Sequence, residues 1–179
     1  MSHATQAMLA RADHEAMDAG LLQFLRFALG DGIYAVPIDA VREILEVGPS
    51  TPLPLMPSFV RGVMNLRGAV VPVIDLAARL GLSPAVVGRR TCIVVVEVTS
   101  LDSSDGHAQV LGLMVDAVHE VLEADAASME EAPTLGTRID PRYIQGIARN
   151  RNEMVSVLDL PRTLDTEELA TLIGQPTTH

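Results

Sequence analysis

From Leu21 onward the chain consists of short apolar runs separated by turn-forming residues, with a turn at intervals of about ten residues. Runs of this length are typical of the strands of an all-β barrel or sandwich. Gly30-Asp31-Gly32 is a hairpin signal, and Arg67-Gly68 separates another pair of expected strands. The expected strands are residues 21–29, 33–37, 59–66, 69–74, 91–98, 110–115, 143–148 and 154–158.

Three segments between these strands depart from the strand pattern. Four prolines fall within residues 49–57, and because proline has no N–H for a strand ladder, this segment cannot be a central strand. Residues 41–45 are expected to form a short turn of helix or an irregular bend. Residues 75–81 predict a short helix, with Asp75 as its N-cap and Gly81 as its stop.

The two ends of the chain are expected to lie outside the β domain, which we place at residues 21–164. Residues 1–20 are rich in Ala, Met and small polar residues, which favours a flexible lead-in. Residues 165–179 are expected to form a C-terminal amphipathic helix and tail, with Thr163 or Asp165 as the helix cap.

The expected strands belong to a pattern that occurs twice. Residues 36–46 align with residues 113–123, and residues 59–76 align with residues 143–160. The second shift is larger than the first, and the added residues fall in a loop, where insertions are tolerated. The repeat predicts two similar small barrels packed side by side. They correspond to subdomain 1, about residues 21–82, and subdomain 2, about residues 90–164.

Several side chains recur at equivalent positions of the two copies. In the first block the identical residues include Glu43 and Glu120, and in the second block Arg67 and Arg151 correspond. Other identical pairs are Asp39 with Asp116, Ala40 with Ala117, Val41 with Val118, Leu45 with Leu122, Glu46 with Glu123, Gly62 with Gly146, and Asp75 with Asp159.

Composition and charge narrow the possible functions. Hydrophobic residues make up 48% of the 179, enough for a core, and only 3% are aromatic. The net charge of −10 argues against nucleic-acid binding, which needs a basic face. No apolar run reaches the roughly 18 residues of a membrane span, and no secretion signal opens the sequence, so we expect a cytoplasmic protein without membrane insertion. The single Cys92 is expected to be a buried strand thiol.

Catalytic and metal-binding chemistry finds little support in the sequence. The five histidines show no metal-ligand spacing, and Asp102-Ser-Ser-Asp-Gly106 lacks the closing Glu of a calcium loop. The repeated Asp75 and Asp159 suggest the dyad of an acid hydrolase. However, Leu-Ala and Leu-Pro follow them where such a site needs Ser or Thr and Gly, so helix N-capping is the favoured interpretation. We therefore expect no enzyme activity, no metal and no cofactor.

One family matches the order of these motifs. Residues 34–44, the proline segment and residues 62–76 resemble the signature of CheW proteins, and residues 112–122 and 143–147 resemble its second half. The resemblance covers roughly residues 21–164. It implies two intertwined, five-stranded SH3-like barrels that exchange strands and share one hydrophobic core, with short helices.

The resemblance also implies a function and a site. The expected function is a non-catalytic adaptor that couples the cytoplasmic tip of a chemoreceptor to the regulatory domain of a CheA-type histidine kinase. Arg67 and Glu43 fall on family motif positions that matter for this coupling. The opposite charges predict that these two side chains lie close together on the surface, although a partner's carboxylate is the other candidate for Arg67.

Neighbouring residues complete the expected partner-binding site. Apolar side chains beside a polar rim suit a protein interface, but the same side chains can equally belong to the barrel core. Residues of the expected site are Val41, Glu43, Val63, Asn65, Leu66 and Arg67. Three glycines, Gly62, Gly68 and Gly146, are expected to be structural, at a bulge or a positive φ.

The sequence leaves two other functions open. The first is a regulatory module of the same fold outside chemotaxis, in twitching motility, development or second-messenger control. The second, much more remote, is the acid hydrolase that would use Asp75 and Asp159.

Overall fold

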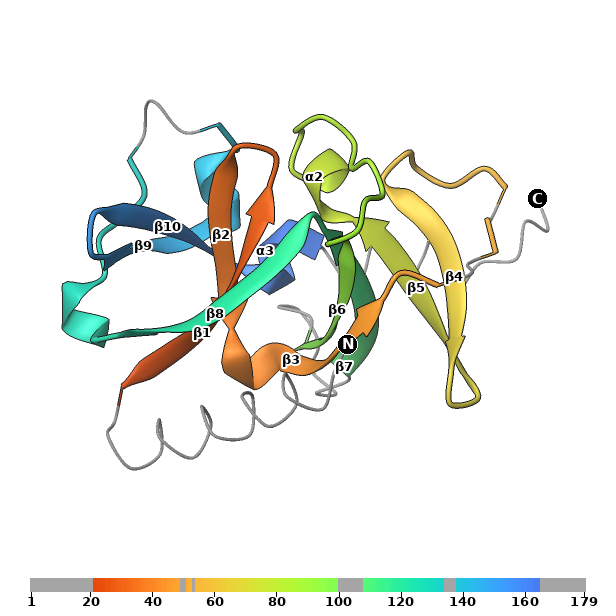
Figure 1. Ribbon diagram of the computed structural model, residues 1–179, viewed down its shortest axis with the longest axis horizontal. Helices are drawn as coiled ribbons and strands as arrows, with labels where there is room; N and C mark the ends of the chain where they lie inside the picture. The colour runs from red at the N-terminus through yellow and green to blue at the C-terminus, as the bar shows by residue number, and fades with distance from the viewer. Residues whose placement is uncertain (1–20, 49–50, 53, 100–107, 134–137, 165–179) are drawn as a thin grey trace.

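The computed structural model describes residues 21–48, 51–52, 54–99, 108–133 and 138–164. Two five-stranded sheets lie side by side in it (Figure 1). Sheet A has the order β8-β1-β2-β10-β9, and sheet B has the order β3-β6-β7-β5-β4. The strands are β1 (Leu22–Leu29), β2 (Gly32–Pro37), β3 (Val41–Glu46), β4 (Val60–Leu66), β5 (Ala69–Asp75), β6 (Cys92–Thr99), β7 (Ala108–Val115), β8 (Ala117–Ala124), β9 (Ile144–Asn150) and β10 (Glu153–Leu158).

Short helical segments connect these strands. Their positions are η1 (Ile38–Ala40), α2 (Leu76–Arg79), η2 (Ala126–Ser128), η3 (Pro141–Tyr143) and α3 (Leu160–Leu164). The predicted helix after Asp75 is confirmed as α2, where the Asp75 carboxylate accepts a hydrogen bond from Ala78 N. The expected C-terminal helix, its cap Asp165, the lead-in and the loop over residues 100–107 lie outside the described residues.

Sheet A combines strands from both ends of the described domain, whereas the strands of sheet B follow one another along the chain. Sheet A joins β1 and β2 to β8, β9 and β10, whereas sheet B joins β3, β4 and β5 to β6 and β7. The two junctions are parallel: Tyr34 of β2 pairs with Ser156 of β10, and Val73 of β5 pairs with Gly112 of β7. The other strand pairs are antiparallel. The expectation of two intertwined five-stranded β units is therefore confirmed.

One expected element is wrong and another was missed. Residues 41–45 form strand β3, not a helical turn, and the only helical turn nearby in the described chain is η1 just before it. Val41 and Ile44 are β-branched, and pairing with β6 satisfies the backbone that a helical turn would leave outside the sheet. The equivalent block of the repeat forms β8, which the hydrophobic pattern did not reveal.

Three hydrophobic clusters hold the sheets together. The largest contains residues from both sheets, such as Leu25 of β1 and Val94 of β6, both fully buried. A second cluster lies within sheet A and includes Phe24, and a third lies within sheet B and includes Ile93. Because neighbouring strand residues point to opposite faces, each sheet places one face on the shared core and the other on its own cluster. The expected shared core is confirmed.

A single residue outside the named strands extends the edge of each sheet. Thr51 pairs with Val63 of β4 through two backbone hydrogen bonds of 2.9 Å, and Glu130 pairs with Ile147 of β9 through bonds of 2.9 and 2.7 Å. Gly62 directly precedes Val63, and Gly146 directly precedes Ile147. These two glycines occupy equivalent positions of the repeat. The chain therefore approaches both edges at equivalent positions.

The first of these glycines has no room for a side chain. Gly62 has a φ of 147°, and a Cβ there would lie 2.4 Å from the carbonyl oxygen of Thr51. At Gly146 a Cβ would meet the flexible Met129 Cε at 3.0 Å and the oxygen of Glu130 at 3.3 Å. Glycine is thus essential at position 62, where a Cβ would overlap backbone atoms. At position 146 a larger residue would require the Met129 side chain to move.

Candidate functional site

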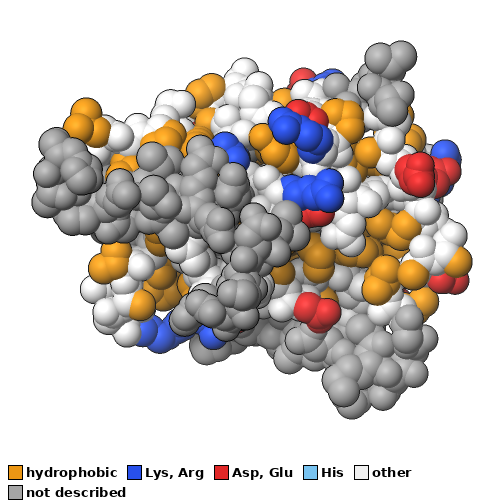
Figure 2. Space-filling model, turned by 180° about the vertical axis from the view of Figure 1, so that it is seen from behind, with side chains coloured by type: hydrophobic (Ala, Val, Ile, Leu, Met, Phe, Trp, Pro, Cys, Tyr) orange, Lys and Arg blue, Asp and Glu red, His pale blue; other side chains and the backbone are white. Residues whose placement is uncertain are grey.

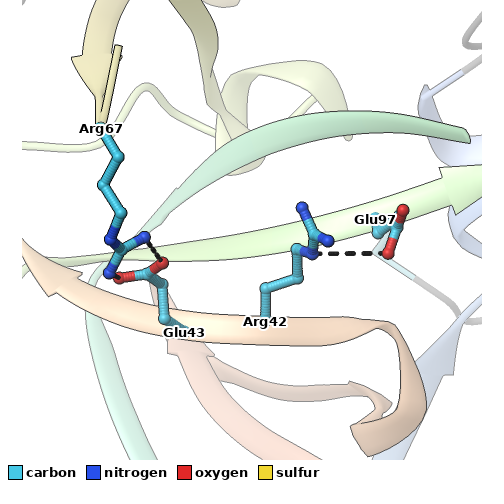
Figure 3. Close-up of polar contacts among 4 residues, drawn as sticks. All are labelled: Arg42, Glu43, Arg67 and Glu97. Atoms are coloured by element: carbon cyan, nitrogen blue, oxygen red, sulfur yellow. Dashed lines mark hydrogen bonds and ion pairs between the residues drawn. The ribbon is translucent and has the colours of Figure 1, made fainter. Parts of the chain in front are cut away.

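Arg67 and Glu43 form a bidentate ion pair across sheet B (Figure 3). Arg67 Nη1 donates to Glu43 Oε2 at 2.5 Å, and Nη2 donates to Oε1 at 2.8 Å. The arginine lies in the turn that joins β4 to β5, and the glutamate lies on β3. Strands β3 and β4 are the two edge strands of the sheet. The predicted proximity of these two side chains is confirmed. The ion pair links edges that lie at opposite ends of the strand order.

The backbone of the β4–β5 turn presents Arg67 to β3. Arg67 has a φ of 52° and Gly68 a φ of 87°, so both central residues of the turn are left-handed, as in a type I′ hairpin. The Asn65 side chain accepts a hydrogen bond from Gly68 N at 3.0 Å. A left-handed arginine is strained. Asn65, one of the expected site residues, therefore stabilises the turn through this hydrogen bond. Gly68 adopts the left-handed conformation that the turn requires.

The ion pair is asymmetric in its exposure. Only 13% of the Glu43 side chain is exposed, against 71% of the Arg67 side chain. The next residue on β3, Arg42, pairs instead with Glu97 of β6 at 3.4 Å, and both of those side chains are about half exposed (Figure 3). Most of the Arg67 side chain therefore stays exposed while its guanidinium is held by Glu43.

The hydrogen bond from Arg67 lowers the pKa of the Glu43 carboxyl below its ordinary value of 4.5, against the opposing effect of burial. A carboxyl with a depressed pKa contributes stability above its unfolded pKa, and this contribution falls as the pH drops through the folded value. The ion pair should therefore be intact at neutral pH and should break only in acid below about pH 4.5.

An NMR titration of the Glu43 side-chain carboxyl should give a pKa below 4.5 in the native chain. Arg67→Ala should raise that pKa because the donor of the hydrogen bond is removed. Arg42→Ala, which removes a weaker and more distant charge, should change the Glu43 pKa much less. Equal shifts in the two variants would show that the bidentate contact does not persist in solution.

The expected apolar site residues are half-buried. Val41 packs against the shared core, Leu66 packs against the sheet B cluster, and Val63 is the residue that pairs with Thr51. Of these, Leu66 borders a groove of about 290 Å³ beside the Arg67 turn. The structure thus joins Leu66, Asn65 and Arg67 in one region, whereas Val41 lies at the opposite end of β3.

Sequence reasoning missed most of this groove. Its walls also contain Leu45 and Val47 from β3 and the chain after it, and Met64 from β4. The floor is buried and consists of Val73, Ile93 and Met114. The alternation of Met64 and Leu66 on one strand face was the available signal, but it does not show which face would stay accessible.

The repeated aspartates act as helix caps. Asp75, 1% exposed, accepts hydrogen bonds from Ala78 N at 3.2 Å and Ala85 N at 2.9 Å. Asp159 accepts from Arg162 N at 3.1 Å in the first turn of α3. Among the hydrogen bonds of the described residues, none joins the two carboxylates, and each is occupied by backbone N–H groups of its own segment.

Other expectations concern metals, the thiol and the membrane. The described segments contain no group of three potential metal-ligating side chains, and the Asp102–Gly106 loop lies outside them. Cys92 is buried at the start of β6 as predicted, and burial raises the pKa of its thiol. No helix within the described ranges is long and apolar enough to cross a membrane.

The distribution of charge on the surface is mixed. On the face seen in Figure 2, and apart from the residues left undescribed, arginine side chains lie in small groups beside acidic ones, with apolar side chains between them. Such a face offers no continuous basic surface to a phosphate backbone. Protein surfaces with interspersed charges and apolar residues are suited instead to protein partners.

Comparison with known proteins agrees with this geometry. The CheW-like domain matches residues 23–168. Chemotaxis protein CheW of Rhizobium meliloti is 34% identical over 146 residues, covering 82% of this chain and 89% of that protein. The chain belongs to the CheW-like family. Protein FrzA of Myxococcus xanthus is 33% identical over 146 residues, covering 80% and 86% of the two chains.

A solved CheW structure shows that the fold is shared as well. The crystal structure of the scaffolding protein TtCheW from Thermoanaerobacter tengcongensis superposes with a TM-score of 0.68 at 34% sequence identity. The match covers 78% of this chain and 85% of that one. The two interleaved sheets of the present CheW-like chain are thus those of a known scaffolding protein.

Proposed function

We propose that this protein is a non-catalytic adaptor of a chemotaxis signalling system, which couples methyl-accepting chemoreceptors to a CheA-type histidine kinase. Membership of the CheW-like family and the scaffolding role named for the solved relative support this function. Such an adaptor works in the cytoplasm through protein surfaces alone. Its partners are the cytoplasmic tip of the receptor and the regulatory domain of the kinase.

The observation that carries the proposal is the Arg67–Glu43 pair beside an apolar groove. The guanidinium is fixed in position by two hydrogen bonds, yet most of its surface is exposed. A fixed, exposed arginine can form a further charge-assisted contact at little cost in side-chain entropy. Leu66 and Met64 next to it provide the apolar part of such an interface.

A pathway outside chemotaxis would use the same surfaces. Protein FrzA is compatible with that alternative, but its similarity is no greater than that of the chemotaxis proteins, so it does not favour it. We therefore retain the chemotaxis adaptor as the proposed function.

Arg67→Glu should reduce receptor-dependent kinase activation by about tenfold or more in a reconstituted receptor–kinase array, because a repulsive charge replaces a contact. The urea midpoint of unfolding should change little, since the pair is largely surface-exposed. Arg42→Glu is the matched control: it makes the same charge change one residue from Glu43 and should leave activation near the wild-type level.

A charge-swapped double variant separates two roles of the pair. Arg67→Glu combined with Glu43→Arg restores the ion pair within the chain. If activation recovers, the pair acts by positioning the turn; if it does not, Arg67 contacts the partner directly. Wild-type activation by the single Arg67→Glu variant would count decisively against this site.

A further inference from the structure

The Arg67 side chain receives little restraint from packing, because most of it is exposed. Two ends therefore fix its position: the backbone of the β4–β5 turn at one end and the Glu43 carboxylate at the other. The glutamate end is held well, since little of the Glu43 side chain is exposed. The turn end lies in solvent, so its conformation depends on local hydrogen bonds.

The Asn65 side chain holds this turn by the bond that its Oδ1 accepts from Gly68 N at 3.0 Å. Asn65 pairs with Val70 in the β4–β5 ladder, whereas Gly68 belongs to the tip between the two strands. The hydrogen bond therefore ties the tip to the strand. It offsets part of the cost of the left-handed backbone at Arg67.

The direction of the Arg67 side chain depends on this backbone conformation. In turns of types I and II the first central residue has a negative φ, so its Cα–Cβ bond leaves the turn in another direction. Arginine prefers such a φ in the absence of other contacts. A turn released from Asn65 would therefore relax and carry the guanidinium away from Glu43.

The second copy of the repeat has the arginine but not the asparagine. Arg151 lies in the β9–β10 turn and is also left-handed, with a φ of 60°. Arg149 stands at the position equivalent to Asn65, and its Nε donates to Glu130 Oε2 at 3.0 Å. An arginine side chain has no acceptor to offer the turn. The second turn residue is Asn152, whose φ is not positive, so the two turns differ in type.

The arginine of the second copy does not bind the matching glutamate. The repeat places Glu120 on β8, where Glu43 lies on β3. Among the described residues, no ion pair or hydrogen bond joins the side chains of Arg151 and Glu120. A left-handed arginine and a glutamate at repeat positions are thus not enough for the ion pair, and the turn that forms it is the one that contains Asn65.

We propose that Asn65 is a positioning residue of the partner-binding site, whose hydrogen bond to Gly68 N holds the turn in the form that lets Arg67 reach Glu43. Asn65 then affects partner coupling through Arg67 and not by a contact of its own. Only this effect on coupling rests on the proposed adaptor function. The effect on the ion pair belongs to the isolated chain.

The first test is an NMR titration of the Glu43 carboxyl in the full chain. Asn65→Ala should raise the pKa of Glu43 towards the value found in Arg67→Ala, because a relaxed turn weakens the hydrogen bond from Arg67. The urea midpoint should change little, since the Asn65 hydrogen bond is exposed. Arg149→Ala, at the equivalent position of the other copy, is the matched control and should leave the Glu43 pKa at its native value.

The second test is a double-mutant cycle on receptor-dependent kinase activation. Asn65→Ala should reduce activation by about fivefold, as expected for the loss of one hydrogen bond that supports the site. Added to Arg67→Ala, it should reduce activation no further, because its effect passes through the arginine.

Two results would overturn the inference: an unchanged Glu43 pKa in Asn65→Ala, or losses of activation that multiply in the double variant. The second result would mean that Asn65 contacts the partner directly. A wild-type chain that does not support activation would contradict the proposed function instead, and the titration would still decide whether Asn65 positions Arg67.

Discussion

A chain that ends after Leu82 is expected to remain unfolded, although it contains five of the ten strands of the described residues. In the intact protein β2 pairs with β10, β5 with β7, and β3 with β6, and truncation removes all three partners. The fragment also loses about half of the shared core, which lies after Leu82 and comes mostly from β6 and β7. At this length a single core seldom supplies more than about 3 to 5 kcal/mol.

The measurement is a pair of experiments on residues 21–82 and 21–179. The shorter fragment should give a collapsed amide NMR spectrum or aggregate, and the longer chain should unfold in one cooperative transition followed by circular dichroism and by calorimetry. Two separated transitions in the longer chain, or a well-dispersed spectrum from the fragment, would contradict the shared core.

Gly62→Ala is expected to destabilise the protein by about 3 kcal/mol, from overpacking and backbone strain together. The added Cβ would lie 2.4 Å from the Thr51 oxygen, and this neighbour is backbone that cannot rotate away. The φ of 147° is also rarely adopted by alanine. A urea titration should show the lower stability as a shifted midpoint with an unchanged slope.

Gly146→Ala is the matched control from the other sheet. Its Cβ would first meet the end of the flexible Met129 side chain at 3.0 Å, which can move. The expected loss is about 1 kcal/mol, within the range of a mild overpacking. If both glycine variants lost the same stability, the close approach of Thr51 to β4 would not be the cause.

The sequence predicted elements that local patterns define. The β1–β2 hairpin follows from Gly30-Asp31-Gly32, and helix α2 follows from Asp75 and the glycine stop. The repeat predicted two similar β units, and their shared core is present. Strand β3 was missed because Arg42 and Glu43 interrupt its apolar pattern, and because its partner β6 lies far along the chain.

The site was predictable only in part. Opposite charges at two motif positions predicted the contact between Arg67 and Glu43, which the structure confirms, but a role for either residue in partner binding stays a proposal. Nothing local reveals that Arg26 would bond Glu153, because the two residues are 127 positions apart and Arg26 lies within an apolar run. Side-chain pairing between distant strands depends on the topology, which local periodicity does not encode.

The interleaved strands also determine when the protein can fold during its synthesis. Tyr34 of β2 leaves the ribosome about 120 residues before Ser156, its partner on β10, a delay of roughly 6 to 24 s at about 5 to 20 residues per second. Throughout that time the apolar strands β1 and β2 have no complete sheet to join. Sheet A is therefore finished only after β10 has been synthesised, and the nascent chain depends on protection from aggregation until then.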